Sequence, residues 1–329
     1  MKVGVIGGGS LGTALVKTLL DFKRDDIWWW IYEKKISDHI GIYKRNPYYL
    51  RAIEIDIEKS RMSNRINDII KNVEVIIISV PSLFIRESFQ DVSSSDLSGK
   101  IIISTTKGLI AHGHQTVSEY FTRTFGFPDR DFVFISGPAH AEEIATKKST
   151  YLTWVSTDPD KAKYAETLFG GSFLKIRTSE DLMGLQYTSV LKNIYAIASG
   201  ICYGIGYGDN FISVVMANAI KEIGYFLQHE CPAQRTINSS PYIGDVMVTA
   251  FSNFSRNRTF GELIGRGYSP KMALLELNMI PEGYYSLRSM SRIVEAKKYE
   301  MPVLNAVYRI LYKQSLAEDE ITKLEQHLF

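Results

Sequence analysis

The sequence predicts an α/β protein in which an N-terminal doubly wound parallel sheet is followed by a mostly helical C-terminal domain. Three observations carry this prediction. A glycine-rich turn follows the first strand-like run, short apolar runs alternate with helical patterns up to about residue 155, and strand-like runs disappear from about Leu182 onwards. Strands that alternate with helices are typical of right-handed βαβ units. With 329 residues the chain is long enough for two domains, which we expect at residues 1–183 and 184–329.

The first element is a strand at Val3–Ile6, which leads into a turn with the spacing G-x-G-x-x-G at Gly7, Gly9 and Gly12. A helical stretch, 13–20, follows. In dinucleotide-binding domains the first glycine makes the tight turn, the second lets the backbone approach a pyrophosphate, and the third lets helix and strand pack closely. Amide groups at the start of the helix then bind phosphate. The alternative is a glycine turn that binds nothing.

A second strand, 27–32, ends directly before Glu33. An acidic residue at this place accepts hydrogen bonds from the ribose hydroxyls on the adenine side of a dinucleotide. Glu33 would repel a 2′-phosphate and so favours NAD, whereas Lys34 and Lys35 beside it could accept such a phosphate. The expected cofactor is therefore NAD(H) or NADP(H), and the choice between them stays open.

Further apolar, mostly β-branched runs predict strands at 73–80, 101–104, 132–135 and 151–155, with helical patterns between them at 111–125 and 141–146. Such runs are typical of strands buried on both faces of a sheet. Besides the glycine turn, two unusual loops, 105–108 and 136–140, directly follow predicted strands. Since ligands bind outside the carboxyl ends of parallel strands, we expect these loops to converge on a site.

From residue 184 the sequence predicts helices at 185–201, from about 209, at 291–300 and at 302–314, with a glycine-rich break at 200–208. Lys192 lies in the first of these helices, between apolar flanks. One interpretation is a surface lysine whose stem lies along apolar neighbours while its ammonium reaches water. The other is a partly buried lysine whose pKa is lowered by burial, so that it can act as a general acid or base.

Two later segments carry charged side chains that are candidates for substrate binding. Asp245 follows Gly244 and precedes an apolar helical stretch, where it either caps that helix or orients the lysine and a substrate hydroxyl. The segment Ser255-Arg256-Asn257-Arg258 is either a solvated turn or a phosphate clamp, because Arg binds phosphate oxygens in a bidentate fashion. Lys107, at a strand end, either holds an anion or faces solvent.

The composition excludes several other classes of protein. The net charge is only +2, from 38 Lys and Arg against 36 Asp and Glu, so nothing favours a nucleic-acid or membrane-surface partner. Two cysteines and six histidines, among them His112 and His114, show no disulfide framework and no metal-ligand spacing, so we expect free thiols and no metal. No signal peptide and no apolar run of about 20 residues is visible, which predicts a cytoplasmic protein without a membrane span.

Short segments over nearly the whole chain also match a known pattern. They are GGGSLGTA at 7–14, NPYYL at 46–50, VPS at 80–82, KG at 107–108, SGP at 136–138, LKNI at 191–194, GD at 244–245, SRNRTFG at 255–261 and EG at 282–283. In this order, and especially with Leu-Lys-Asn before Gly-Asp before Ser-Arg-Asn-Arg, the chain resembles the bacterial NAD(P)-dependent glycerol-3-phosphate dehydrogenase family.

The resemblance implies a Rossmann domain and a helical domain, with the active site in the cleft between them. It implies hydride transfer between a nicotinamide and C2 of dihydroxyacetone phosphate, which gives sn-glycerol 3-phosphate for glycerophospholipid synthesis. It further implies that Lys192 is the general acid and base and that Asp245 is its partner. The substrate contacts it implies are Lys107, Gly137, Ala139, Ser255, Arg256 and Asn257. The cofactor contacts it implies are Ser10, Leu11, Lys107, Ala141, Arg256, Ile280 and Glu282, in addition to Gly7, Gly9, Gly12 and Glu33.

Two residues depart from the pattern of the family. Ala139 stands where many members have a serine that contacts substrate, and Leu11 replaces an aromatic residue that is frequent there. The resemblance also suggests a homodimer. Two alternatives stay open: a related two-domain dehydrogenase of another phosphorylated or hydroxy-acid substrate, and a non-catalytic protein that senses nucleotides. The retained Lys192 and Asp245 speak against the second.

Overall fold

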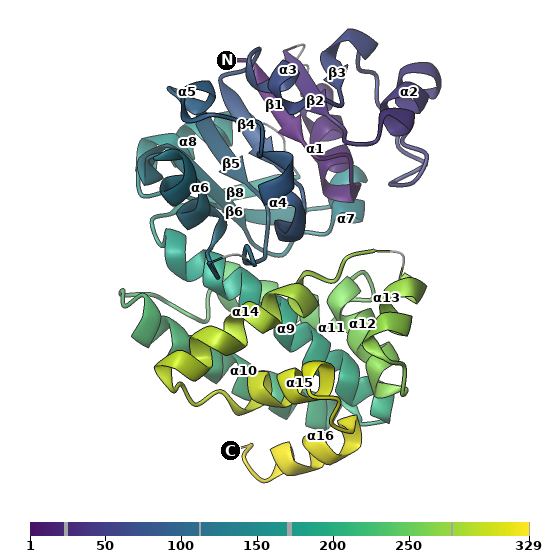
Figure 1. Ribbon diagram of the computed structural model, residues 1–329, viewed down its shortest axis with the longest axis vertical. Helices are drawn as coiled ribbons and strands as arrows, with labels where there is room; N and C mark the ends of the chain where they lie inside the picture. Colours follow the sequence, from purple (N-terminus) through teal and green to yellow (C-terminus); the bar gives the residue numbers. More distant parts are fainter. Residues whose placement is uncertain (23–25, 112, 170–172, 278, 329) are drawn as a thin grey trace. The chain divides into compact units, whose positions relative to one another are not determined.

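The computed structural model describes residues 1–22, 26–111, 113–169, 173–277 and 279–328. The chain forms two compact units (Figure 1). The first unit comprises residues 1–106 and 117–182, and the second comprises residues 107–116 and 183–329. The segment 107–116 thus belongs to the second unit, whereas a single boundary near residue 184 would leave it in the first.

The first unit contains a sheet whose strands, within the described residues, have the order β3-β2-β1-β4-β5-β6-β7-β8. The predicted doubly wound fold is confirmed, with helices on both faces of the sheet (Figure 1). The strands are β1 (Val3–Ile6), β2 (Ile27–Trp30), β3 (Met62–Ser63), β4 (Val75–Ile78), β5 (Ile101–Ser104), β6 (Phe132–Ser136), β7 (Thr150–Val155) and β8 (Leu174–Ser179). Every residue of β1, β4, β5 and β6 is buried, as their continuous apolar sequences predict.

The far edge of the sheet differs from the prediction. Strand β7 runs antiparallel to β6, and β8 then pairs parallel with β7. Residues 137–149 connect β6 to β7 and contain one short helix, α7 (Ala141–Ala145). Strand β8 was not predicted, because most of its residues are partly or fully exposed and it has no continuous apolar run.

The helices of the first unit are α1 (Ser10–Asp21), α2 (Lys34–Tyr43), α3 (Ile66–Ile70), α4 (Ser82–Ser88), α5 (Ser94–Leu97), α6 (Val117–Phe125), α7 and α8 (Pro159–Thr167). One of them, α6, differs from its expected range, and α2 was not expected. Helix α6 begins at Val117, later than the predicted 111, because Ile110 and Gln115 form an antiparallel bridge before it. Helix α2 lies in a polar stretch that gave no clear helical signal.

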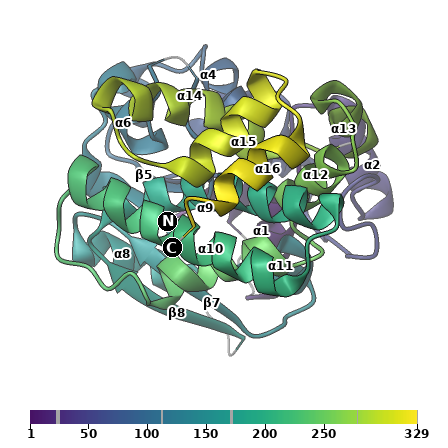
Figure 2. The same ribbon diagram turned by 90° about the horizontal axis from the view of Figure 1, so that it is seen from below.

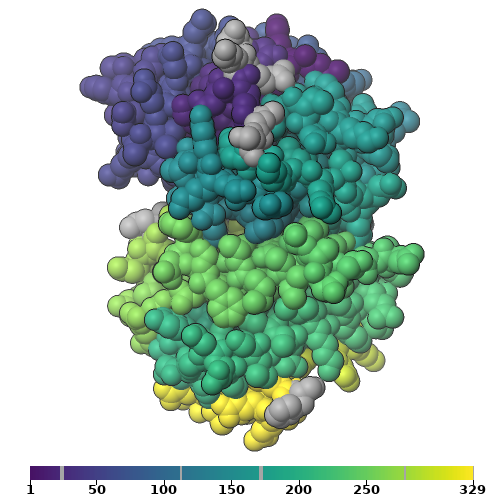
Figure 3. Space-filling view, turned by 180° about the vertical axis from the view of Figure 1, so that it is seen from behind, coloured from purple at the N-terminus to yellow at the C-terminus, as the bar shows by residue number. Residues whose placement is uncertain are grey.

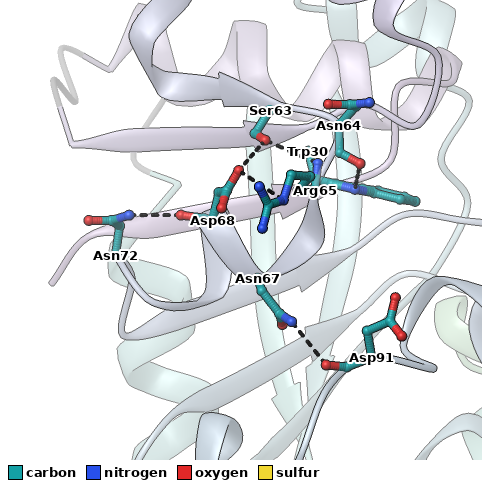
Figure 4. Close-up of polar contacts among 8 residues, drawn as sticks. All are labelled: Trp30, Ser63, Asn64, Arg65, Asn67, Asp68, Asn72 and Asp91. Carbon is teal, nitrogen blue, oxygen red and sulfur yellow. Dashed lines mark hydrogen bonds and ion pairs between the residues drawn. The ribbon is translucent and has the colours of Figure 1, made fainter.

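Polar contacts around α3 fix one edge of the sheet (Figure 4). The indole nitrogen of Trp30, the last residue of β2, donates to the carbonyl oxygen of Asn64 at 3.0 Å. The Ser63 hydroxyl donates to the Asp68 carboxylate at 2.8 Å. The Asn67 amide donates to the carbonyl oxygen of Asp91 at 2.9 Å. The bond from Trp30 holds the end of β2, the strand that leads towards Glu33, against the segment before α3.

The second unit is helical, as predicted. Its helices are α9 (Leu182–Ile205), α10 (Asp209–Glu230), α11 (Asp245–Phe251), α12 (Arg256–Gly265), α13 (Pro270–Leu277), α14 (Glu282–Lys297), α15 (Pro302–Tyr312) and α16 (Ala317–Glu325), with a π-helical turn at Ser240–Gly244. Figure 2 shows α15 and α16, in yellow, side by side. Residues 185–202 of α9 are all buried, so this helix is the centre of the unit.

The glycine-rich segment 200–208 is not a break over its whole length, because α9 continues to Ile205. A Cβ atom on Gly200 would lie 2.0 Å from the carbonyl oxygen of Arg258, and one on Gly204 would lie 2.3 Å from that of Glu262. The missing side chains therefore let α9 and α12 approach with their backbones in contact. The prediction of a break was wrong here because glycine at such a crossing serves packing and not flexibility.

Candidate active site

The glycine turn of the first unit has the geometry that its spacing predicts. Gly7 has a φ of +131°, which side chains rarely allow, and a Cβ on Gly12 would lie 2.1 Å from the Gly7 carbonyl oxygen. A Cβ on Gly9, in contrast, would meet no atom within 4 Å. The first and third glycines are thus required by the fold, and the second leaves open space beside the backbone.

That open space fits the pyrophosphate of a dinucleotide. Ser10, which is 6% exposed, begins α1, and the N-cap residue Gly9 supplies no side-chain hydrogen bond to the first amides of this helix. A helix start with uncapped amides is a binding site for anions. The buried hydroxyl of Ser79, just after β4, has no hydrogen-bond partner among the described residues. It lies 3.7 Å from the position of a Cβ built on Gly12, so a polar group at this turn could satisfy it.

Charged residues follow β2. Glu33 is exposed at the N-cap of α2, and its side chain makes no capping hydrogen bond. Lys34 binds Asp38 at 2.6 Å, and Lys59 binds the other oxygen of Asp38 at 3.1 Å. The Lys35 ammonium lies 5.3 Å from the centre of the Tyr48 ring. Both lysines that follow Glu33 thus have partners within the protein.

The loop after β6 contains three of the predicted site residues. Gly137 has a φ of +117°, and a Cβ there would lie 2.7 Å from the carbonyl oxygen of Tyr151, so this position needs glycine for packing alone. Ala141, the first residue of α7, is buried in a small apolar cluster with Ala14 of α1. Ala139 and Leu11 pack against the same cluster. These contacts explain the residue types, and the proposed ligand contacts of the four residues stay predictions.

The second unit brings three of the predicted charged residues together. The Lys192 ammonium donates a hydrogen bond to Oδ1 of Asp245, and the Lys107 ammonium donates to Oδ2 at 3.1 Å. Lys192 is 4% exposed and Asp245 is 1% exposed, which excludes the interpretation of Lys192 as a surface lysine. We call Lys107, Lys192 and Asp245 the lysine–aspartate cluster.

Each member of the cluster comes from a different part of the chain. Lys192 lies on α9, Asp245 is the first residue of α11 after the π-helical turn, and Lys107 follows β5. The side-chain amide of Asn193 donates to the Lys107 carbonyl oxygen at 2.9 Å and so ties this segment to α9. Asp245 is not an N-cap, since Gly244 holds that position and the carboxylate binds the two ammonium groups.

Burial governs the electrostatics of the cluster. Loss of water around the ammonium lowers the pKa of Lys192 to about 7, with the Asp245 charge acting in the opposite direction and Lys107 in the same direction. Burial alone would raise the pKa of Asp245, but the charges of Lys107 and Lys192 outweigh it and hold that pKa below its usual value. The cluster thus has an ionised carboxylate beside a lysine that gains and loses a proton near neutral pH.

The predicted phosphate clamp lies at the start of α12. The Ser255 hydroxyl oxygen accepts a hydrogen bond from the Arg258 amide at 3.3 Å, and Oδ1 of Asn257 accepts one from the Gly283 amide at 2.9 Å. Ser255 is 4% exposed and Asn257 is 7% exposed, whereas Arg256 is half-buried. This segment is therefore more than a solvated turn.

The start of α14 packs against the same region. A Cβ on Gly283 would lie 2.5 Å from the Asn193 carbonyl oxygen and 3.0 Å from Oδ1 of Asn257. Glu282 and Ile280, the predicted cofactor contacts nearby, are half-buried beside Pro281. The glycine lets three helix segments meet: the middle of α9 and the starts of α12 and α14.

Sequence reasoning missed several residues that the structure connects to these sites. The pairing of Lys107 with Asp245 depends on residues 138 positions apart and has no local signal. Asn46 lies in the segment 46–50, which matched the family pattern without indicating a role for this residue, yet it is completely buried against the glycine turn. Asn193 did have a signal, since a polar residue beside Lys192 in an apolar helix needs a partner.

Comparison with known proteins identifies the family. Residues 2–162 match the family model described as NAD-dependent glycerol-3-phosphate dehydrogenase N-terminus, and residues 181–322 match the model of its C-terminus. The chain is 34% identical to glycerol-3-phosphate dehydrogenase (NAD(P)+) of Staphylococcus carnosus, over 98% of this chain and 97% of that protein. The chain belongs to this family.

Further relatives agree. The protein of the same name from Clostridium botulinum is 34% identical over 95% of this chain and 93% of its own length. The crystal structure of glycerol-3-phosphate dehydrogenase from Coxiella burnetii superposes with a TM-score of 0.92 at 26% identity, with 98% of each chain covered. Membership in the family implies a nicotinamide cofactor.

The described residues contain no group of three or more His, Cys, Asp or Glu side chains that could hold a metal ion, and His112 lies outside them. None of the helices they form is long and apolar enough to span a bilayer. Cys202 is buried and Cys231 is half-buried, and neither forms a disulfide.

Proposed function

We propose that this chain interconverts dihydroxyacetone phosphate and sn-glycerol 3-phosphate with NAD(H) or NADP(H). Family membership supports this reaction, and the observation that carries it is the buried lysine–aspartate cluster. A lysine with a pKa of about 7 exists in both protonation states near neutral pH. That is the property a general acid and base needs to serve both directions of a reaction.

We assign most of the dinucleotide contacts to the first unit and most of the substrate contacts to the second. Gly9, Ser10 and Gly12 would hold the pyrophosphate through backbone amides, as the open space beside Gly9 supports. Gly7 would shape the turn that presents them, since its own amide donates to the Trp30 carbonyl oxygen. The other cofactor contacts proposed are Leu11, Glu33, Lys107, Ala141, Arg256, Ile280 and Glu282. The bound nicotinamide supplies the hydride that the protein lacks.

Lys192 is the proposed proton donor to the oxygen on C2 of the substrate during reduction, and the proton acceptor during oxidation. Asp245 fixes the ammonium in position and raises the pKa of Lys192 against the effect of burial. Lys107 binds the other carboxylate oxygen, so Asp245 stays charged when Lys192 has lost its proton. The carboxylate therefore does not need to take up a proton during turnover.

The segment Ser255-Arg256-Asn257 is the proposed clamp for the substrate phosphate, with Gly137 and Ala139 as further substrate contacts. Ser255 and Asn257 use acceptor atoms for their bonds to Arg258 and Gly283. The hydroxyl hydrogen of Ser255 and the amide hydrogens of Asn257 remain to donate to phosphate oxygens. Together with the start of α12 and the Arg256 guanidinium, they form an environment suited to an anion.

We further propose that NADH is preferred over NADPH. Glu33 is exposed and would repel a 2′-phosphate, while Asp38 and Tyr48 engage the two neighbouring lysines. A kcat/KM at least several-fold higher with NADH is expected. Equal or higher kcat/KM with NADPH would show that the lysines leave their partners and bind the phosphate.

Steady-state assays with reduced nicotinamide test the proposed reaction. Turnover with dihydroxyacetone phosphate should greatly exceed turnover with 2-oxo carboxylates that lack a phosphate. Faster reduction of a carboxylate would favour a dehydrogenase of another substrate class. Cofactor binding without any turnover would favour the nucleotide sensor. The proposed cellular setting, a cytoplasmic homodimer in glycerophospholipid synthesis, is tested by fractionation and by the mass of the native protein.

A further inference from the structure

We propose that Asn46 is a positioning residue for the cofactor, because it fixes the peptide between Gly8 and Gly9 with the Gly9 N–H group facing the bound pyrophosphate. This inference rests on the proposed dinucleotide site at the glycine turn. It adds a residue that lies far from the turn in sequence and touches it only through the backbone.

Asn46 uses both ends of its side-chain amide. Nδ2 donates to the Gly8 carbonyl oxygen and to the Thr13 hydroxyl, each at 3.0 Å. Oδ1 accepts hydrogen bonds from the amides of Tyr48 at 3.1 Å and Tyr49 at 3.2 Å. Since backbone amides lie at one end and a carbonyl at the other, the two ends of the amide cannot be exchanged. The Asn46 side chain is completely buried, and its bond to the Thr13 hydroxyl is buried as well.

Planarity of the peptide bond transmits this contact to the other side of the turn. In a trans peptide the C=O of one residue and the N–H of the next point in opposite directions. Holding the Gly8 carbonyl oxygen towards Asn46 therefore aims the Gly9 N–H away from it. The Gly9 amide makes no hydrogen bond to any described residue, and a Cβ on Gly9 would meet nothing within 4 Å.

The residue type follows from this arrangement. An aspartate has the same shape and could still accept from Tyr48 and Tyr49, but it offers no donor to the Gly8 carbonyl oxygen. Its carboxylate would face that oxygen, and the peptide would be free to rotate away. Asn46 therefore fixes the orientation of the Gly9 N–H group, which the flexible glycine backbone would not hold by itself.

The test compares Asn46→Asp with Thr13→Val. Each variant removes a buried hydrogen bond of Nδ2, but only the first releases the Gly8 carbonyl oxygen. Calorimetric titration with NADH and with ADP-ribose measures binding, and thermal unfolding measures the structural cost. Asn46→Asp should bind both ligands about tenfold more weakly, whereas Thr13→Val should change binding less than about twofold.

The steady-state readout separates positioning from general damage. In Asn46→Asp the KM for NADH should rise about tenfold, while kcat at saturating NADH stays near that of the wild type. If N46D does not fold, Asn46→Ala removes the same donor without adding charge. Its loss of NADH and ADP-ribose affinity relative to Thr13→Val is expected to be the same as for N46D.

Unchanged ADP-ribose affinity in N46D overturns the inference, and so does an equal loss in Thr13→Val. Failure of the wild-type protein to bind either NADH or NADPH would overturn the proposed function, and this inference with it. Wild-type binding with no difference between the variants overturns the inference alone.

Discussion

The glycine turn and the lysine–aspartate cluster depend on opposite features of their residues: absent side chains in the first and charged side chains in the second. The turn depends on side chains that are missing: a single added carbon at Gly12 would lie 2.1 Å from the backbone of Gly7. The cluster depends on three charged side chains, two of them buried at 4% and 1% exposure. The first site is thus disrupted by adding atoms and the second by removing charge. Substitutions at the two sites should therefore change different measured properties.

Lys192→Ala should have the largest effect. Loss of a general acid and base typically costs about 10²–10⁴-fold in rate, so kcat should fall by that amount while the Kd for NADH stays unchanged. Stopped-flow and titration measure the two quantities. Lys271→Ala, at an exposed lysine on α13, is the control and should leave both unchanged. A variant at Lys192 with near-normal kcat would show that the proton comes from elsewhere.

Asp245→Asn should change the pH dependence of the second site. The carboxylate charge raises the pKa of Lys192 and opposes the effect of burial, so its removal should lower that pKa below about 7. The protonated fraction at neutral pH then falls about tenfold for each unit of further decrease. The pH–rate profile for reduction should move to lower pH, with kcat at pH 7 roughly 10- to 100-fold lower. An unmoved profile would assign the titration to another group.

Two glycine variants separate the fold of the turn from its binding role. Gly12→Ala should destabilise the first unit by roughly 1–3 kcal/mol, since backbone would have to shift around the new carbon. Gly9→Ala should unfold at nearly the wild-type temperature because no protein atom lies within 4 Å of the new carbon. Its Kd for NADH should nevertheless rise about tenfold, because that carbon occupies the space proposed for pyrophosphate. Normal NADH affinity in Gly9→Ala would place the phosphates elsewhere.

Asp38→Asn should have the smallest effect, and it tests whether the lysines after Glu33 influence the preference for NADH over NADPH. The change frees Lys34 and Lys59 from their shared partner. Because exposed ion pairs are weak, the ratio of kcat/KM for NADPH to that for NADH should rise only about two- to fivefold. Asp56→Asn, which releases Lys44 elsewhere in the first unit, is the matched control. An equal rise in both variants would point to net charge alone.

The same contrast explains how far the sequence could be interpreted. The glycine turn, the strands β1, β4, β5 and β6, and the helical nature of the second unit follow from local pattern, because spacing and continuous apolar runs act over a few residues. Strand β8 escaped prediction since exposure removes its apolar pattern. The continuation of α9 to Ile205 was not predicted, because Gly200 and Gly204 suggested a break. These glycines are needed for close packing against α12, which is visible only in the folded structure.

The candidate site shows the same limit. Lys192 and Asp245 were predicted as a pair, but their burial and the contact of Asp245 with Lys107 depend on tertiary structure. The role of Asn46 depends on a hydrogen bond to a glycine 38 positions earlier, which no spacing rule describes. Side-chain identity suggested the chemistry, whereas the pKa of Lys192 comes from the surroundings that the fold provides.

The second unit has its apolar and aromatic side chains partly on the surface. Met247 and Phe251 of α11 and the nearby Phe254 are 43%, 38% and 53% exposed. Figure 3 shows the green residues, which include α10 and α11, over much of the drawn face of this unit. Asp245 begins the same helix but is buried in the lysine–aspartate cluster. One side of α11 is therefore buried, and the other exposes apolar side chains to solvent.

The segment 107–116 has a consequence for exchanging parts between related enzymes. The chain passes from the first unit to the second after Thr106, returns at Val117 and passes over again after Leu182. Within the second unit, the Leu109 amide donates to the Ser286 hydroxyl, and Lys107 pairs with Asp245. A chimaera joined once at residue 182 would therefore take Lys107 from one parent and both Lys192 and Asp245 from the other. Grafting a new dinucleotide domain onto this protein needs three junctions, so that one parent supplies the whole charged cluster.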